Sequence, residues 1–122
     1  MFNYQIVLVP QIITLPEDTT NNTGGTVAFT CEVKGWPVPS IEWRMKTDAN
    51  EMPLPSDNNY ISVQTRGGPS DYELTSWLQI MDAKREYSGI YICVATNSEG
   101  EARASAYLTI GNFKKNFPIN FE

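Results

Sequence analysis

The chain has 122 residues, a formal net charge of −5 at pH 7, two cysteines and no histidine. This length suits one domain with a single core, and the acidic balance argues against binding nucleic acid or an anionic membrane, which requires a basic surface. Without histidine, the usual Ser-His and Cys-His pairs and mixed zinc sites cannot form, so we expect neither an enzyme nor a cofactor.

The start of the chain does not resemble a targeting segment. The apolar run from Ile6 to Val9 is too short for a signal-peptide core, and no small-residue cleavage site follows it. No apolar run in the sequence approaches the ~18–20 residues that would cross a bilayer. We therefore expect no membrane span, and Met1 is interpreted as the start of a fragment of a longer mature protein.

Short alternating runs separated by turn residues predict an all-β chain. Residues 1–16 are interpreted as an extension and an edge strand interrupted by prolines, and 17–25 as a polar turn. Further strands are expected at 26–34, 40–46, 60–65, 71–81, 89–97 and 101–110. The segments 35–39 and 47–58 are predicted as loops, the second with at most a short strand. The predicted organisation is an extension at 1–9, a domain at 10–110 and a phenylalanine-rich tail at 111–122.

The spacing of four residues points to one architecture. Cys31 lies in the strand at 26–34, Trp43 follows twelve residues later, and Tyr91 stands two residues before Cys93. This is the framework of an immunoglobulin-like Greek-key β-sandwich of two antiparallel sheets. The resemblance implies a Cys31–Cys93 disulfide between the sheets, worth ~4 kcal/mol in the chain-entropy model. It also implies that Trp43 and Leu78 lie in the core and that Tyr91 bonds to the backbone of the preceding turn.

Two signals favour an oxidising compartment. One is the implied disulfide, and the other is Asn21-Asn22-Thr23, a glycosylation acceptor on a predicted surface turn. Together they predict a secreted, extracellular glycoprotein. The alternative is a pair of buried free thiols, as in the immunoglobulin domains of cytosolic muscle proteins.

Alternation along the strand at 89–97 identifies a candidate binding face. If Tyr91 and Cys93 point inward, the residues between them point outward. The resulting apolar stripe is Ile90, Ile92 and Val94, extended by Tyr107 and flanked by Arg44. A partner, a cover formed by the chain termini, and an ordinary β-branched strand without function are the three interpretations.

Three further residues are secondary candidates for binding. Trp77 is expected to face outward on the opposite sheet, and Trp36 to lie at the tip of the loop at 35–39. Tryptophan is enriched at binding hot spots, but packing against neighbouring strands or prolines explains both residues as well. Arg66 begins the turn Arg66-Gly67-Gly68-Pro69, which serves either binding or chain reversal.

The sequence resembles the intermediate-set (I-set) immunoglobulin domains. Val94-Ala-Thr-Asn-Ser-Glu-Gly100 is similar to their A-x-N-x-x-G signature, and Gly35-x-Pro-x-Pro39 to their loop between the second and third strands. A narrower resemblance is to the C-terminal domain of secreted, Kazal-type-containing proteins related to insulin-like growth factor-binding proteins. It rests on segments such as Gln64-Thr-Arg-Gly-Gly-Pro69 and Trp77-Leu-Gln-Ile80. One departure is Tyr87, where the class usually has an aspartate in an ion pair; Glu86 is the candidate substitute.

The family resemblance implies a function in protein binding. In that family a cysteine-rich module and a Kazal module precede the immunoglobulin domain, and growth-factor binding and protease inhibition belong to those modules. We therefore expect a non-enzymatic module of a growth-factor-regulating or matrix-associated protein. Its partner would be an insulin-like growth factor, a matrix protein or a second copy in a homodimer. The alternative is a structural or homophilic adhesion module without a soluble ligand.

Overall fold

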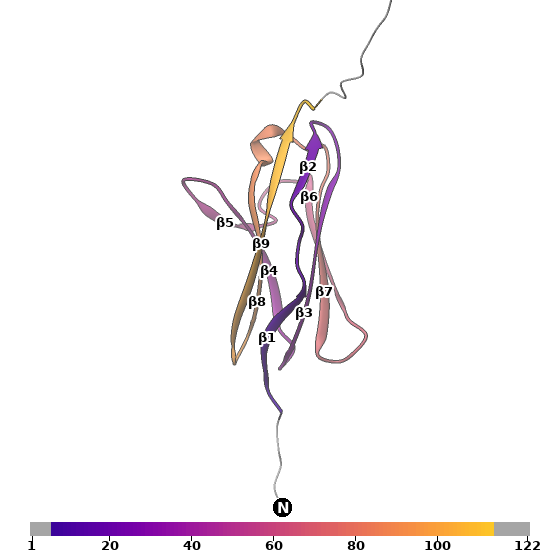
Figure 1. Cartoon of the computed structure of the whole chain (residues 1–122), viewed down its shortest axis with the longest axis vertical. Helices are drawn as coiled ribbons and strands as arrows, with labels where there is room; N and C mark the ends of the chain where they lie inside the picture. The colour runs from indigo at the N-terminus through magenta and orange to yellow at the C-terminus, as the bar shows by residue number, and fades with distance from the viewer. Residues whose placement is uncertain (1–5, 114–122) are drawn as a thin grey trace, which may run out of the picture.

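The computed structural model describes residues 6–113, which form two sheets packed face to face (Figure 1). One sheet has the strand order β1-β3-β7-β6 and the other β2-β9-β8-β4-β5. The first contains β1 (Leu8–Thr14), β3 (Val27–Trp36), β7 (Glu73–Ile80) and β6 (Ile61–Gly67). The second contains β2 (Thr19–Asn22), β9 (Gly100–Gly111), β8 (Gly89–Asn97), β4 (Ser40–Lys46) and β5 (Glu51–Leu54). The all-β sandwich predicted from the sequence is confirmed.

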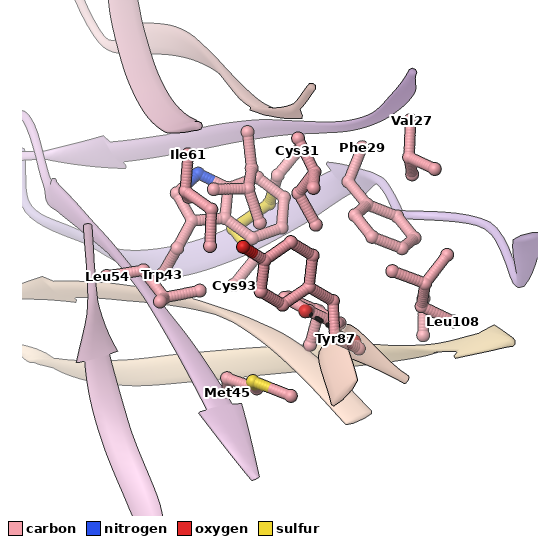
Figure 2. Packing of buried hydrophobic residues seen from close by; sticks show 14 of the residues in the cluster. Val27, Phe29, Cys31, Trp43, Met45, Leu54, Ile61, Tyr87, Cys93 and Leu108 are labelled. Atoms are coloured by element: carbon pink, nitrogen blue, oxygen red, sulfur yellow. Dashed lines mark hydrogen bonds between the residues drawn. A yellow bond between two sulfur atoms is a disulfide. The ribbon is translucent and has the colours of Figure 1, made fainter. Parts of the chain in front are cut away.

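The core lies between the sheets and is organised around the predicted framework. A disulfide joins Cys31 on β3 to Cys93 on β8, with Cα atoms 6.5 Å apart, which confirms the implied pairing. Trp43 and Leu78 are fully buried in the same cluster, and Phe29 stacks on the Tyr91 ring with centroids 5.3 Å apart. Figure 2 shows the disulfide and Trp43 side by side.

A hydroxyl network satisfies the indole of Trp43 within this apolar core. Its Nε1 donates to Ser76 Oγ at 2.9 Å, and Ser76 Oγ donates to the Gln64 carbonyl at 3.2 Å. Thr65 Oγ1 also donates to Ser76 Oγ, at 3.0 Å. A buried donor without a partner costs about 1–3 kcal/mol, so Ser76, the only buried polar residue among those described, allows tryptophan to occupy this position.

The turn before β8 contains the Tyr91 hydrogen bond that the resemblance implied, but within residues 6–113 it lacks the ion pair for which Glu86 was the candidate. It contains a short 3-10 helix, Arg85–Tyr87, and Tyr91 donates its hydroxyl to the Tyr87 carbonyl at 2.6 Å. Tyr87 is itself buried, and its hydroxyl accepts from Asn58 Nδ2 at 2.8 Å. Glu86 is exposed and forms no ion pair within residues 6–113. A neutral tyrosine–asparagine pair therefore links this turn to the β5–β6 connection.

Two segments differ from their sequence-based predictions. Residues 19–22, predicted as turn, form β2 and pair in parallel with β9, because a short strand at a sheet edge needs no apolar face. β3 continues to Trp36, where Leu8 of β1 pairs with it, so part of the predicted 35–39 loop is strand. As the prediction of at most a short strand within 47–58 allowed, residues 51–54 form β5, which projects from the side of the sandwich (Figure 1). The phenylalanines at 117 and 121 lie outside the described residues.

Candidate protein-binding face

The outer face of the five-stranded sheet carries the predicted apolar stripe on β8. Tyr91 and Cys93 belong to the core, whereas Ile92 and Val94 lie outside that cluster, on the opposite face of the strand. The direction agrees with the alternation, but the exposure does not. Ile92 is only 8% exposed and Val94 only 5%, so the expectation of an open stripe is wrong for these two residues.

A network of charged side chains explains why Ile92 and Val94 on the outer side of β8 are buried. Arg44 Nη1 donates to Glu42 Oε1 at 2.8 Å, and Arg44 Nε to Glu51 Oε1 at 2.9 Å. Arg103 Nε donates to Glu101 Oε2 at 2.8 Å, and its Nη1 reaches Glu51 Oε1 at 3.3 Å. We call these five residues the charged belt.

The register of the sheet places the charged belt over the stripe. Val94 pairs with Glu42 on one side and Arg103 on the other, while Ile92 pairs with Arg44. Because Arg103 on β9 reaches Glu51 on β5, the belt crosses both intervening strands. Arginine stems readily cover apolar surface while their guanidinium groups stay solvated. Within residues 6–113, the cover is therefore formed by the sheet itself.

Ionisation of the belt reflects these contacts. Hydrogen bonding to Glu42 and Glu101 raises the pKa of Arg44 and Arg103 respectively. Partial burial raises the pKa of Glu51, but hydrogen bonds from Arg103 and Arg44 outweigh it and hold that pKa below its ordinary value of 4.5. Glu51 is thus the shared anion between two cations, and its charge keeps the two halves of the belt together.

One part of this face remains open. Ile90 is half-buried, and Tyr107 beside it is 60% exposed. The cross-strand row is Lys46–Ile90–Tyr107. Two hollows lie on either side of Ile90: one is lined by Gly89 and Tyr107, the other by Ile92 and Ser105, and Lys46 borders both. The open area is therefore displaced from the predicted centre toward the β8 start.

The secondary candidates do not join this surface. Trp77 is on the other sheet, half-buried, with the Arg66 guanidinium carbon 6.0 Å from its ring centroid. Trp36 is 40% exposed at the end of β3, where it pairs with Leu8 of β1. Asn97 Nδ2 fixes this end of the sandwich, because it donates to the carbonyls of Leu8 at 2.8 Å and Pro37 at 2.9 Å.

Asn21, the predicted glycosylation acceptor, lies in β2 and has a partly buried side chain. Its Nδ2 donates to the Thr26 carbonyl at 3.0 Å, and its Oδ1 accepts from the Asn22 amide at 2.8 Å. Gly25 leaves the room for this, since a Cβ there would approach Nδ2 to 2.7 Å. Asn21 Nδ2 is the atom that would carry a glycan. In the folded chain one of its two hydrogens is therefore already engaged in the hydrogen bond to the Thr26 carbonyl.

Sequence reasoning missed four residues of this face: Glu51, Glu101, Arg103 and Lys46. A signal for them was present, since alternation also turns Glu101 and Arg103 outward on β9 and leaves them opposite β8. What was lacking was the position of β5, because the short strand allowed within 47–58 was not placed at Glu51. Without that strand, the acceptor that joins Arg44 to Arg103 has no predicted position.

Comparison with known proteins identifies the family. The model of the immunoglobulin I-set domain matches residues 10–110. The chain belongs to the I-set family. The solved structure of the titin M3 domain has a TM-score of 0.70 with this I-set domain, at 28% identity over 86% of this chain and 99% of that one.

Curated relatives place the I-set domain among larger proteins. It is 47% identical over 106 residues to "Insulin-like growth factor-binding protein-related protein 1" of Cupiennius salei, covering 86% of this chain and 41% of the relative. It is 48% identical over 101 residues to "Kazal-type serine protease inhibitor domain-containing protein 1" of Mus musculus, covering 83% and 32%. The chain thus spans about a third to two fifths of these relatives, as the sequence resemblance implied.

The described residues contain neither a membrane-spanning helix nor a cluster of metal-binding side chains. No helix within residues 6–113 is long and apolar enough to cross a membrane. In the same part of the chain, no group of three or more His, Cys, Asp or Glu side chains is arranged to hold a metal ion. Immunoglobulin domains and the relatives named above belong to non-enzymatic families.

Proposed function

We propose that this I-set domain is a non-enzymatic, extracellular protein-binding module of a secreted growth-factor-regulating or matrix-associated protein. It binds through the outer face of the five-stranded sheet, and an insulin-like growth factor is the first partner to test. The support for this class of function is the relatedness to insulin-like growth factor-binding-protein-related chains together with the open surface described above.

The observation that carries the choice of surface is the Lys46–Ile90–Tyr107 row. Tyr107 offers a rigid aromatic ring that is 60% exposed, and hollows flank the partly buried Ile90. An aromatic anchor beside apolar depressions, with a charged rim, is the usual composition of an interface centre. Lys46 and the charged belt supply that rim. The binding centre we propose is therefore Ile90 and Tyr107, with Arg44 at the rim and Ile92 and Val94 beneath the belt.

The test is a label-free titration of the disulfide-intact domain with an insulin-like growth factor at physiological salt. Tyr107→Ala should weaken saturable binding about 30-fold, as loss of a hot-spot aromatic does. Tyr72→Ala removes a comparably exposed tyrosine at another site and should leave the affinity within about twofold, since residues outside an interface contribute little.

Two results separate the partner from the surface. Absence of binding at tens of micromolar rejects the hormone, and the same variants are then compared for binding to decellularised matrix. If the domain binds either partner and Tyr107→Ala binds like wild type, the proposed face is wrong. If neither partner is bound, the protein-binding proposal itself is rejected.

A further inference from the structure

Sheet edges in this sandwich are unequally protected. Exposed edges invite pairing with other chains, and natural proteins blunt them with prolines, bulges or short strands. β1 contains Pro10 and two register shifts. β2 and β5 have four residues each, and β5 includes Pro53. Three of the four edges therefore carry a recognised obstacle to further pairing.

β6 is the exception. It has seven residues, Ile61–Gly67, and pairs with β7 in continuous register along its whole length. It contains no proline and no lysine, and Arg66 is its only charged residue. Within residues 6–113 no strand pairs with its other side. The four residues from Gln64 to Gly67 are all exposed, so the edge is open as well as regular.

The flanking hydrogen bonds show which backbone groups of β6 are free. The Met81 amide donates to the Tyr60 carbonyl at 2.8 Å, and the Gly68 amide donates to the Glu73 carbonyl at 2.7 Å. Hydrogen-bonded pairs alternate along an antiparallel ladder, so the even-numbered residues 62, 64 and 66 bond to β7. The N–H and C=O groups of Val63 and Thr65 consequently point to the open side.

These free groups match a second copy of the same strand. In an antiparallel pair centred on Gln64, Val63 of one copy faces Thr65 of the other, and their amides and carbonyls form four hydrogen bonds in two symmetric sets. We propose that two copies of this chain associate through β6 in this register, which joins their four-stranded sheets into one of eight strands.

The side chains are compatible with this self-pairing on both faces. On the inner face the pair is Val63 with Thr65, and β-branched residues pack well across strands. On the outer face Gln64 meets its counterpart at the two-fold axis, where two amides can hydrogen-bond to each other. Arg66 faces Ser62, so no like charges are opposed. Although the chain carries a net charge of −5, β6 contains none of its acidic residues.

A second copy is the occupant that this sequence specifies. An arbitrary extended peptide would be selected by side-chain pockets beside the edge, whereas the features described here are symmetric about Gln64 itself. The surface lies on the sheet opposite the proposed binding face, so this association does not depend on the proposed function. An interface confined to one strand pair is expected to be weak, because contacts below ~1,200 Å² belong to transient complexes.

Sedimentation equilibrium across a concentration series up to about 1 mM, a range suited to a weak interface, tests the proposal on the full 122-residue chain. Wild type should form a dimer. Gln64→Lys should weaken it about fivefold or more, because it places two lysines opposite each other. Gln79→Lys adds the same charge on the adjacent strand β7, where Gln79 is exposed and pairs with Ser62, and should dimerise like wild type.

The centre of symmetry has a sharper test. Gln64→Glu alone should also dimerise poorly, but an equimolar mixture of Gln64→Glu and Gln64→Lys should recover at least the wild-type level of association, because opposite charges then meet at the axis. Amide exchange gives an independent readout, since the Val63 and Thr65 amides should become protected as concentration rises while even-numbered neighbours are protected throughout. A monomer at every concentration, or no effect of Gln64→Lys, overturns the proposal.

Discussion

The two sides of β8 are both buried at the middle of the strand, but they are covered by different means. On the inner side, Cys93 is buried by the disulfide, Trp43 and the rest of the core. On the outer side, Ile92 and Val94 are buried under the charged belt. Apolar packing is non-directional and does not titrate, whereas a cover made of ion pairs weakens with salt and with protonation. The burial of the inner side of β8 should therefore be insensitive to salt and acid. The outer side, in contrast, should become exposed when salt or acid weakens the ion pairs.

The largest effect on stability should come from removing the disulfide on the inner side of β8. Replacing both Cys31 and Cys93 by alanine opens a loop with a sequence separation of 62, which should lower the free energy of unfolding by about 4 kcal/mol. Urea denaturation followed by tryptophan fluorescence measures this. A loss below about 1 kcal/mol would mean that the core holds without its cross-link, contrary to the usual range for native disulfides.

A smaller effect should come from the polar atom inside the core. Ser76→Ala leaves the Trp43 indole N–H without its acceptor, and the expected loss is about 1–3 kcal/mol of unfolding free energy. Ser105→Ala removes the same hydroxyl from the exposed outer face of β9 and should change stability by less than about 0.5 kcal/mol. Equal losses of unfolding free energy in the two variants would contradict a special role for the buried Ser76 hydroxyl.

The smallest effect on stability, but the most specific, should come from acid. The pKa of Glu51 is lowered in the folded state, so its contribution is complete above the ordinary 4.5 and is lost as pH falls through the lower folded value. Below that pH the belt should loosen and a hydrophobic dye should bind the still-folded domain through Ile92 and Val94. Dye fluorescence, with near-ultraviolet circular dichroism to confirm folding, measures this.

Glu51→Gln provides the matched test of the acid response. It should bind dye at neutral pH as the wild type does in acid, whereas Glu99→Gln, which changes an exposed carboxylate outside the belt, should not. The inner side responds in the opposite direction. Burial raises the pKa of Tyr91, so its contribution is present below 10 and is lost as pH rises further. Dye binding by wild type that is independent of pH between 3 and 7 would contradict the titratable cover.

Much of the fold could be predicted because a few residues are compatible with only one position in it, the core between the sheets. Cys31, Trp43 and Cys93 are spaced so that strands in both sheets must bring them together, and the predicted bounds of β4 and β8 are confirmed. β2 was missed because Thr19–Asn22 has no apolar alternation to reveal it. Its pairing with β9 depends on the path of the whole chain.

The binding surface was less predictable for a different reason. Alternation indicates the direction in which Ile92 and Val94 point, and the structure places both outside the core as expected. It does not indicate what lies above them. Coverage depends on the reach of Arg44 and Arg103 to one carboxylate on a third strand, and a single sequence does not encode such distances in any local pattern.

The path of the chain through the sandwich has a mechanical consequence. The described chain enters at the start of β1 and leaves at the end of β9, at opposite ends of the molecule (Figure 1). Tension between these ends would be borne along the long axis. The Cys31–Cys93 bond would prevent the segment between the two cysteines, a separation of 62, from being stretched. At ~3.4 Å per residue, the unfolded chain would therefore be ~200 Å shorter at full extension than it would be without the disulfide. A domain unfolded by force would thus remain a short tether of fixed maximum extension.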